Sequence, residues 1–294
     1  MFRRPSASSN PSVETLEWVL APDVRAGAIR RLEEVWRYRR ILWFFAVKAV
    51  QGLYAKTRLG PVWLVVRPLA PIVAASLVFG QVMQVPSEGF PYFLFLLVGT
   101  TIWNFFDGPL IFATRGLESN RHLLTKLYLP RVILPAGQMA AGLVEPVVCI
   151  GVLIAAVFYY RWTDGVWYVS LAPRLLLAVP LVLLTVMLAF SLSLWTSVWQ
   201  ARARDMRFVL MYSLGFWYLL TPIVYPVSHL PPAARWAAYI NPMTGPVVGF
   251  KWAVLGIGEF PATPLLASLA GAVVLLALGL WYFARVEGQT IDRL

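Results

Sequence analysis

Charged residues are scarce in this chain, and their scarcity excludes an ordinary soluble domain. Only 13% of the 294 residues are charged, whereas about a quarter are charged in a typical globular protein. Hydrophobic residues make up 59% of the sequence. This composition predicts a polytopic membrane protein.

Several kinds of chemistry are excluded by residues that the sequence lacks. Cys149 is the single cysteine, so no intrachain disulfide is possible, and we expect a small buried hydrophobe there. His122 and His229 are predicted on opposite sides of the membrane, which excludes a metal site built from a histidine pair. No Gly-rich loop ends in Gly-Lys-Ser/Thr, and Gly256 and Gly258 lack the third glycine of a dinucleotide fingerprint. We therefore expect no catalytic residues, no metal, no cofactor in this chain, and no ATP hydrolysis by a P-loop of its own.

Six apolar runs are near the length that crosses a bilayer, for which a helix needs about 20 residues. The fold expected from them is an all-α integral membrane protein with a six-span permease domain over residues 61–285. The runs are Val62–Val85, Phe90–Phe112, Val132–Tyr160, Leu171–Trp199, Phe208–Tyr225 and Pro264–Ala284.

Basic residues alternate between the two sides of these spans. Of the 25 Lys and Arg residues, most precede the first span or lie in the loops after the second and fourth spans. The opposite loops hold only Arg161, Arg174, Arg235 and Lys251. By the positive-inside rule both termini are cytoplasmic, and the basic excess indicates topology and not nucleic-acid binding.

Ahead of the first span the sequence predicts two segments. Residues 1–33 read as a cytoplasmic tail without the apolar core of a signal peptide. Residues 34–60 read as an amphipathic interfacial helix, because Trp43, Val47 and Val50 recur at helical spacing behind a cluster of arginines. The alternative is a cytoplasmic helix packed on a partner protein. Residues 286–294 form the cytoplasmic carboxy-terminal tail.

The long extracytoplasmic segment 226–263 is interrupted by prolines. Its apolar part, Val247–Ile257, is too short to span and contains Lys251. Two short re-entrant helices at the exit of a pathway would fit this pattern, since backbone at that depth must be shielded by protein or face water. A simple extracytoplasmic cap fits it equally.

Three charged residues lie within predicted spans, where charges are costly and mark functional hypotheses. At ~1.5 Å per residue from the cytoplasmic boundary, Arg67 lies roughly 9 Å deep, Asp107 roughly 12 Å and Glu145 roughly 20 Å. Arg67 and Asp107 are therefore predicted to pair. Glu145 precedes Pro146, where the helical hydrogen bonds are interrupted, and either accepts a hydrogen bond across the bundle or faces a hydrated pore.

Several sequence blocks, spread from about Trp36 to Arg285, resemble the membrane subunit of ABC-type polysaccharide exporters. The first runs from Tyr54 to Trp63 and continues with Arg67-Pro68-Leu69 and Leu77-Val78-Phe79-Gly80. The later blocks follow in the family's order: Pro91–Phe95, Trp103–Phe106, Ser119–Arg131, Arg204–Arg207, Thr221–Pro226 and Asn241–Gly245. The resemblance is closer to the O-antigen and teichoic-acid branch than to the capsule branch.

This resemblance implies a homodimeric permease in the bacterial inner membrane, bound to two copies of an ABC ATPase subunit that holds ATP and Mg. It also implies a cargo of polysaccharide linked to polyprenyl diphosphate, taken from the cytoplasmic leaflet among membrane lipids. The entry gate would comprise Lys56, Arg58, Gly60, Pro61, Trp63 and Arg67. Cations at that depth suit a diphosphate, although snorkelling to lipid phosphates is the alternative role.

The same resemblance implies two contacts with the ATPase. The coupling loop 116–131 would contain a short helix that docks on it, and a smaller contact would follow the fourth span. The residues assigned to these contacts are Asn120, Leu123, Lys126, Leu127, Tyr128, Arg204 and Asp205. Topology signals alone are the alternative explanation for the basic residues.

A channel that slides polysaccharide favours aromatic side chains, because sugar C–H faces pack on aromatic rings. Two aromatic clusters, on the second and fifth spans, are predicted to line such a channel if the dimer axis runs beside them. They are Trp103, Phe105, Phe106, Phe216, Trp217 and Tyr218. Membrane belts and helix packing use the same residue types.

Other classes fit the span count less well. A membrane-embedded glycosyl- or acyltransferase would carry a clustered acid, histidine or metal motif at one membrane face. A secondary transporter would show repeats and protonatable midplane residues, for which Glu145 alone is little support. Among ABC exporters, permeases for capsule, glycolipid or drug-like substrates are the alternative.

Overall fold

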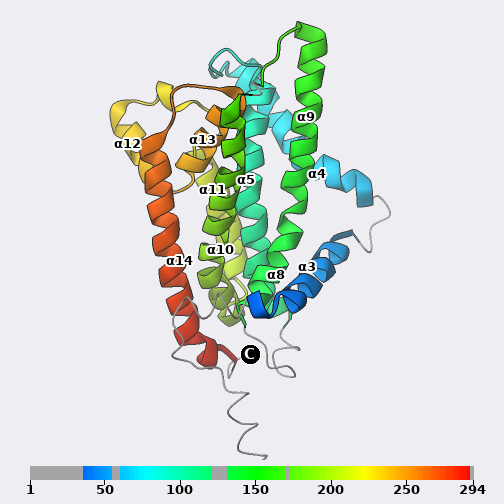
Figure 1. Ribbon diagram of the computed structural model, residues 1–294, viewed down its shortest axis with the longest axis vertical. Helices are drawn as coiled ribbons and strands as arrows, with labels where there is room; N and C mark the ends of the chain where they lie inside the picture. Colours follow the sequence, from blue (N-terminus) through cyan, green and yellow to red (C-terminus); the bar gives the residue numbers. More distant parts are fainter. Residues whose placement is uncertain (1–35, 55–59, 121–130, 170–171, 292–294) are drawn as a thin grey trace, which may run out of the picture.

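The computed structural model describes residues 36–54, 60–120, 131–169 and 172–291, and all regular elements within these ranges are helices (Figure 1). The helices and their bounds are α3 Arg39–Tyr54, α4 Gly60–Ala75, η1 Ser76–Val82, α5 Tyr92–Thr114, α6 Gly116–Ser119, α8 Ile133–Gly142, α9 Val144–Asp164, η2 Pro173–Leu177, α10 Ala178–Arg202, α11 Met206–Leu220, η3 Val227–His229, α12 Pro232–Ile240, α13 Thr244–Leu255 and α14 Ala262–Ile291.

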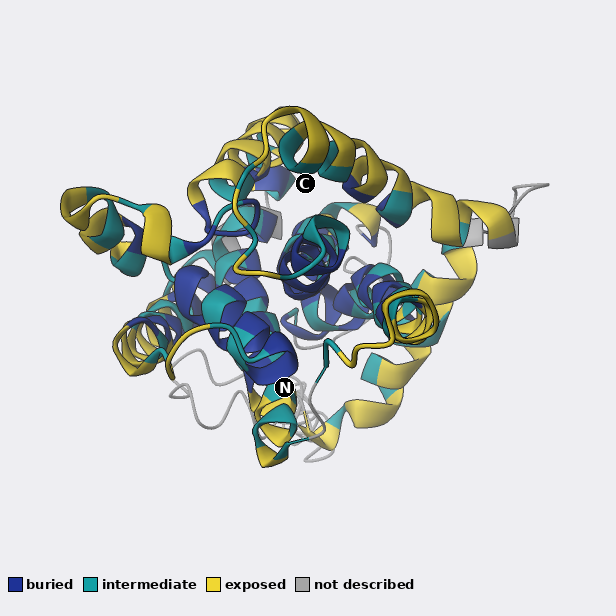
Figure 2. Ribbon diagram, turned by 90° about the horizontal axis from the view of Figure 1, so that it is seen from above, coloured by how far each residue is buried: buried dark blue, intermediate teal, exposed yellow. Residues whose placement is uncertain are grey.

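Helix α5 is the centre of the bundle. It packs against α8, α9, α10, α11, α13 and α4, and Figure 2 shows buried ribbon concentrated at the middle of the molecule. The most apolar window of α5 is 78% buried, against 22% for α14 and 11% for the helix over Val62–Val82. A helix that is apolar on all sides is expected in such a position.

Five helical segments have the length and composition of membrane spans: Val62–Val82, Tyr92–Thr114, Ile133–Asp164, Pro173–Arg202 and Ala262–Val286. The predicted span Phe208–Tyr225 corresponds to α11, which is apolar but has only 15 residues. Helix α11 ends at Leu220 because Pro222 disfavours a helical conformation at Thr221, whose ψ is 138°. The chain continues to Tyr225 without helical structure.

Two glycines bring α5 and α8 into backbone contact. A Cβ on Gly142 would lie 2.3 Å from the carbonyl carbon of Gly108 and from the backbone nitrogen of Pro109. The helix then breaks at Leu143, and α9 begins at Val144, so Glu145 lies in a first turn followed by Pro146. The prediction that Glu145 sits at an interrupted helix is confirmed.

Helix α3 leans against the foot of the bundle. Phe45 is 2% exposed, and its Cβ lies 2.7 Å from where a Cβ of Gly137 on α8 would be. Trp43, Phe44 and Val50 remain exposed on the other side of α3. The helix therefore has an apolar face that the described residues leave uncovered.

The two ends of the bundle carry different structures. Figure 1 shows α3 and the C-terminal part of α14 towards one end, and α12 and α13 towards the other. Helix α13 is buried between α5, α10 and α14, while α12 is mostly exposed.

Candidate functional site

The intramembrane arginine pairs with a different acid from the one predicted. An Arg67 Nη1 atom lies 2.9 Å from Glu145 Oε1, so the expected pairing of Arg67 with Asp107 is wrong. Depth counted along the chain placed Glu145 too far from Arg67, whereas α4 packs against α9 at the break that carries Glu145. The Arg67 side chain is 63% exposed and that of Glu145 24% in this protomer. The pair thus lies at the edge of the bundle with its cation outward.

We expect Arg67→Met to destabilise the protein in the membrane by roughly 1–2 kcal/mol, because Glu145 is left as an unpaired charge. The double variant Arg67→Met/Glu145→Gln should recover most of this loss, whereas Arg67→Met/Asp107→Asn should not. Thermal unfolding of the purified variants in detergent measures both. Equal recovery in the two double variants would contradict the assigned pair.

Four of the six aromatic residues predicted to line a channel, Trp103, Phe106, Trp217 and Tyr218, meet between α5 and α11. Trp103 contacts the rings of Trp217 and Tyr218 at centroid distances of 6.3 and 5.6 Å, and Phe106 lies 5.1 Å from Trp217. The Trp103, Phe105 and Phe106 side chains are buried within the protomer. Their visible role is to join α11 to the central helix.

Phe216, the sixth aromatic residue, points away from the protomer and is 71% exposed. It belongs to a broad apolar face of α11 that also includes Phe208, Val209, Tyr212, Leu219 and Leu220. The described residues of the chain leave this outward face of α11 uncovered.

Asn241 joins three elements at the end of the bundle opposite α3. Its side-chain oxygen accepts hydrogen bonds from Trp217 Nε1 at 2.8 Å and from the Met243 backbone N–H at 2.9 Å. Its amide nitrogen donates to Thr221 Oγ1 at 2.9 Å. The sequence marked Asn241-Pro242 only as part of a motif, and these bonds give the asparagine a physical role.

Lys251 satisfies the backbone where α11 has ended. Its buried Nζ donates to the carbonyl oxygens of Pro222 at 2.9 Å and Ile223 at 2.7 Å, and lies 3.6 Å from the centre of the Phe95 ring. The sequence treated Lys251 only as a charge that prevents a span. Two features of the sequence could have indicated this role. Pro222 interrupts the helix and frees backbone carbonyl oxygens, and Lys251 is a lone charge in the apolar run Val247–Ile257.

Tyr225 caps the same end of α11. Its hydroxyl donates to the carbonyl oxygens of Leu219 and Leu220, at 3.3 and 3.1 Å.

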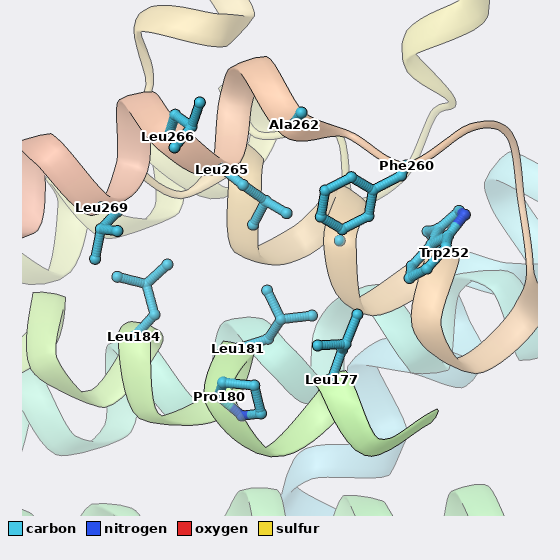
Figure 3. Close-up of a pocket in the computed structure, with 11 residues that line it drawn as sticks. Leu177, Pro180, Leu181, Leu184, Trp252, Phe260, Ala262, Leu265, Leu266 and Leu269 are labelled. Carbon is cyan, nitrogen blue, oxygen red and sulfur yellow. The ribbon is translucent and has the colours of Figure 1, made fainter. Parts of the chain in front are cut away.

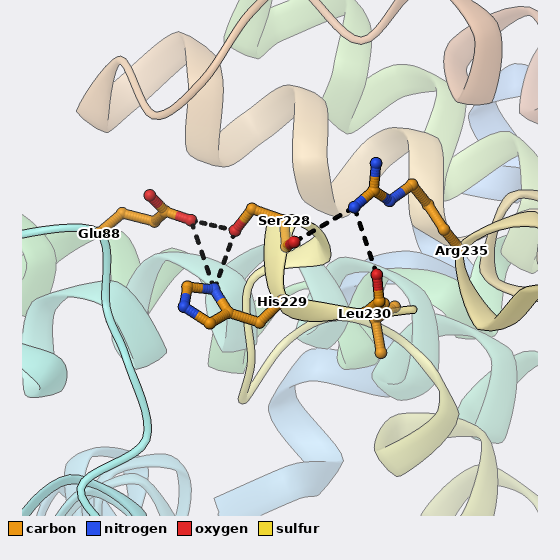
Figure 4. Close-up of polar contacts among 5 residues, drawn as sticks. All are labelled: Glu88, Ser228, His229, Leu230 and Arg235. Atoms are coloured by element: carbon orange, nitrogen blue, oxygen red, sulfur yellow. Dashed lines mark hydrogen bonds and ion pairs between the residues drawn. The ribbon is translucent and has the colours of Figure 1, made fainter. Parts of the chain in front are cut away.

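A polar cluster links the connection between η1 and α5 to the connection between α11 and α12 (Figure 4). Ser228 Oγ donates to Glu88 Oε1, and His229 Nδ1 lies 3.0 Å from Ser228 Oγ and 3.9 Å from Glu88 Oε1. Arg235 donates to the backbone oxygens of Ser228 and Leu230. In a hydrolase triad the serine and the acid contact opposite nitrogens of the imidazole. Here Ser228 and Glu88 both lie next to Nδ1 of His229, so the cluster holds the two connections together and is not a catalytic triad.

At the opposite end, Glu118 bridges the two segments predicted to contact an ATPase. It accepts a 2.7 Å hydrogen bond from the buried Gln200 and lies 3.7 Å from Arg204 Nε. Asn120 is buried and donates to the Gly116 carbonyl oxygen at 3.0 Å. Asp205 is exposed at the start of α11. The predicted contacts Leu123, Lys126, Leu127 and Tyr128 lie outside the described residues.

The predicted entry gate is described only in part. Helix α4 begins at Gly60 and has Pro61 in its first turn, where a proline costs no hydrogen bond. Trp63 is 50% exposed, and Arg67 holds the ion pair with Glu145. Lys56 and Arg58 lie outside the described residues.

Comparison with known proteins adds three findings. The sequence pattern of the ABC-2 type transporter family matches residues 41–255. The chain is 28% identical over 252 residues to a Myxococcus xanthus protein named O-antigen export system permease protein RfbA, covering 84% of this chain and 93% of that one. It is also 23% identical over 204 residues to a Klebsiella pneumoniae protein of the same name, covering 69% of this chain and 76% of that one.

Proposed function

Because the chain belongs to the ABC-2 type transporter family, we propose that it is the permease subunit of an ATP-driven exporter of O-antigen polysaccharide. The observation that carries this proposal is the similarity to O-antigen export permeases over most of both chains. The apolar spans support a multi-pass membrane protein. Because the sequence holds no P-loop, we assign ATP hydrolysis to a separate ABC ATPase subunit.

The proposed cargo is a glycan on polyprenyl diphosphate that enters from the cytoplasmic leaflet of the bacterial inner membrane. Lys56, Arg58 and Arg67 are the cations assigned to its diphosphate. The outward position of Arg67 supports this role, because its side chain is 63% exposed while one nitrogen holds Glu145. The exposed apolar face of α3 would rest on the same leaflet, with both termini cytoplasmic.

We assign the ATPase contacts to the end of the bundle that carries α6 and the start of α11. Glu118 supports this assignment, because it ties α6 to Gln200 and Arg204. A displacement of the 116–131 segment by the ATPase would therefore be transmitted to α10 through the hydrogen bond between Glu118 and Gln200. Two ATPase copies would engage two copies of this chain.

For the membrane path we propose six crossings, with α11 and the non-helical Thr221–Tyr225 segment making the fifth. The 15 residues of α11 rise about 22 Å, short of a hydrocarbon core of about 30 Å. The non-helical residues after it make up the remainder. Lys251 satisfies the carbonyl oxygens of Pro222 and Ile223 there, and Tyr225 satisfies those at the end of α11. Helices α12 and α13 are the proposed re-entrant pair, with α13 shielded by protein. Phe216 and its neighbours on α11 are the aromatic surface offered to a dimer channel.

The proposal is tested by co-purification and export together. An ABC ATPase should co-purify with the tagged full chain, and replacing the ATPase P-loop lysine with alanine should lower surface O-antigen at least about ten-fold. The unmodified ATPase, expressed to the same level, is the control. Glycan-lipid transport by this chain alone in liposomes, driven by an ion gradient, would contradict the proposal.

A further inference from the structure

An apolar pocket of about 430 Å³ opens between α10 and α14 near the end of the bundle that carries α13 (Figure 3). Leu177, Leu181 and Leu184 line one side, and Leu265 and Leu269 line the facing side. The volume falls within the range of about 300–1,000 Å³ found for small-molecule sites. The lining offers almost no hydrogen-bonding atoms, so only a hydrocarbon ligand suits it.

The connection between α13 and α14 forms the end wall of this pocket. Trp252 and Phe260 meet edge to face at 5.1 Å. Gly256 and Gly258 adopt φ values of +77° and +69°, which turn the chain back so that Phe260 returns to Trp252. Trp252 and Phe260 therefore form an aromatic wall at this end of the pocket.

Arg174 stands near this end of the pocket, and its side chain has no hydrogen bond or ion pair with the residues that the structure describes. Arg174 precedes Leu177 by one turn of η2, and its guanidinium lies so close to Gly256 that a Cβ there would be 2.2 Å from an arginine nitrogen. Its Nε is buried and lacks a hydrogen-bond partner among the described residues. The described acid in the same connection, Glu259, is exposed and forms no ion pair with it among the described residues. A buried donor of this kind calls for a ligand or water.

The level of Arg174 in the membrane indicates what that ligand is. Roughly 28 residues of helix separate Arg174 from Arg202, a rise of about 42 Å at 1.5 Å per residue. This matches a bilayer of about 40–45 Å measured with its headgroup regions. With Arg202 at the cytoplasmic surface, Arg174 lies at the level of the outer-leaflet phosphates, and the pocket lies directly below it, at the level of acyl chains.

We propose that this pocket binds one phospholipid of the outer leaflet, with an acyl chain between α10 and α14 and the phosphate on Arg174. The arginine fork supplies the donors that a phosphate oxygen accepts, and the leucine walls exclude any polar ligand. The bound lipid would fasten the α13–α14 connection to the start of α10. This inference concerns the fold in its membrane and does not depend on which cargo is exported.

The test uses the full chain in nanodiscs that contain phosphatidylglycerol with a photoactivatable group in its acyl chain. Labelling should map to peptides containing residues 177–184 and 260–269. Arg174→Gln should reduce this labelling about ten-fold, because the charge-assisted contact with the phosphate is lost. Leu269→Trp should reduce it similarly by filling the pocket.

Two matched variants serve as controls. Arg161→Gln removes another arginine near the same end of the bundle, and Leu278→Trp adds the same bulk to α14 at a residue 49% exposed, against 47% for Leu269. Both should keep wild-type labelling. Equal labelling after Arg174→Gln, labelling spread evenly over all lipid-facing helices, or native mass spectra showing a retained polyprenyl phosphate instead of a phospholipid would overturn the proposal.

Discussion

Gly142→Ala is expected to lower the unfolding temperature of the purified protein by about 5–10 °C, a loss of at least roughly 3 kcal/mol. The added Cβ would stand 2.3 Å from backbone atoms of Gly108 and Pro109. Backbone cannot rotate aside as a side chain does, so α5 and α8 would have to separate. Because α5 is the centre of the bundle, that separation would spread to its other neighbours.

The matched control is Gly151→Ala on α9. A Cβ at Gly151 would meet no heavy atom within 4 Å, so this variant should unfold at the wild-type temperature or slightly above it, since alanine favours a helix. Thermal denaturation in detergent, followed by size-exclusion chromatography, compares the two. If both variants behave alike, the contact between α5 and α8 is not the close one described.

Lys251→Met is expected to cost about 2–5 kcal/mol, because two buried carbonyl oxygens lose their donor. Methionine keeps the length and most of the volume of the stem but cannot donate to Pro222 or Ile223. The residues after α11 would then detach from α13. The expected result is a lower unfolding temperature together with reduced export, read by surface O-antigen.

Lys48→Met provides the comparison, because Lys48 is an exposed lysine on α3. It should leave the unfolding temperature unchanged. The variant Lys251→Arg should also be less stable than the wild type. The lysine stem already fills the space beside Gly99, where a Cβ would lie 2.9 Å from the Lys251 Cε. Wild-type stability of Lys251→Met would show that the two carbonyl oxygens do not depend on this amine.

Family and span positions followed from the sequence because both depend on local features. Hydrocarbon thickness imposes a run of apolar residues on every crossing helix, so five predicted runs coincide with span-length helices. The motif blocks indicated an ABC polysaccharide exporter permease, which the family match and the O-antigen relatives confirm. The break before Pro146 was equally readable, because proline removes a backbone donor.

Which side chains contact each other across helices could not be predicted from such local features. Depth in the membrane, counted along the chain, is a single coordinate, and it predicted a pair between Arg67 and Asp107. In the structure α4 packs against α9, and Arg67 forms its ion pair with Glu145. The six aromatic residues were grouped by type, yet burial separates the inward Trp103 and Phe106 from the outward Phe216. Helix rotation and neighbour choice decide such questions, and both depend on the whole bundle.

The sequence by itself determined that this chain crosses a membrane several times and belongs with exporter permeases, because hydropathy and motifs are linear properties. Only the tertiary structure decided which buried polar groups meet. Lys251 reaches the carbonyl oxygens of Pro222 and Ile223, and Asn241 reaches Trp217 and Thr221. A buried donor must find an acceptor wherever the fold brings one within reach, and that distance is set by packing, not by sequence separation.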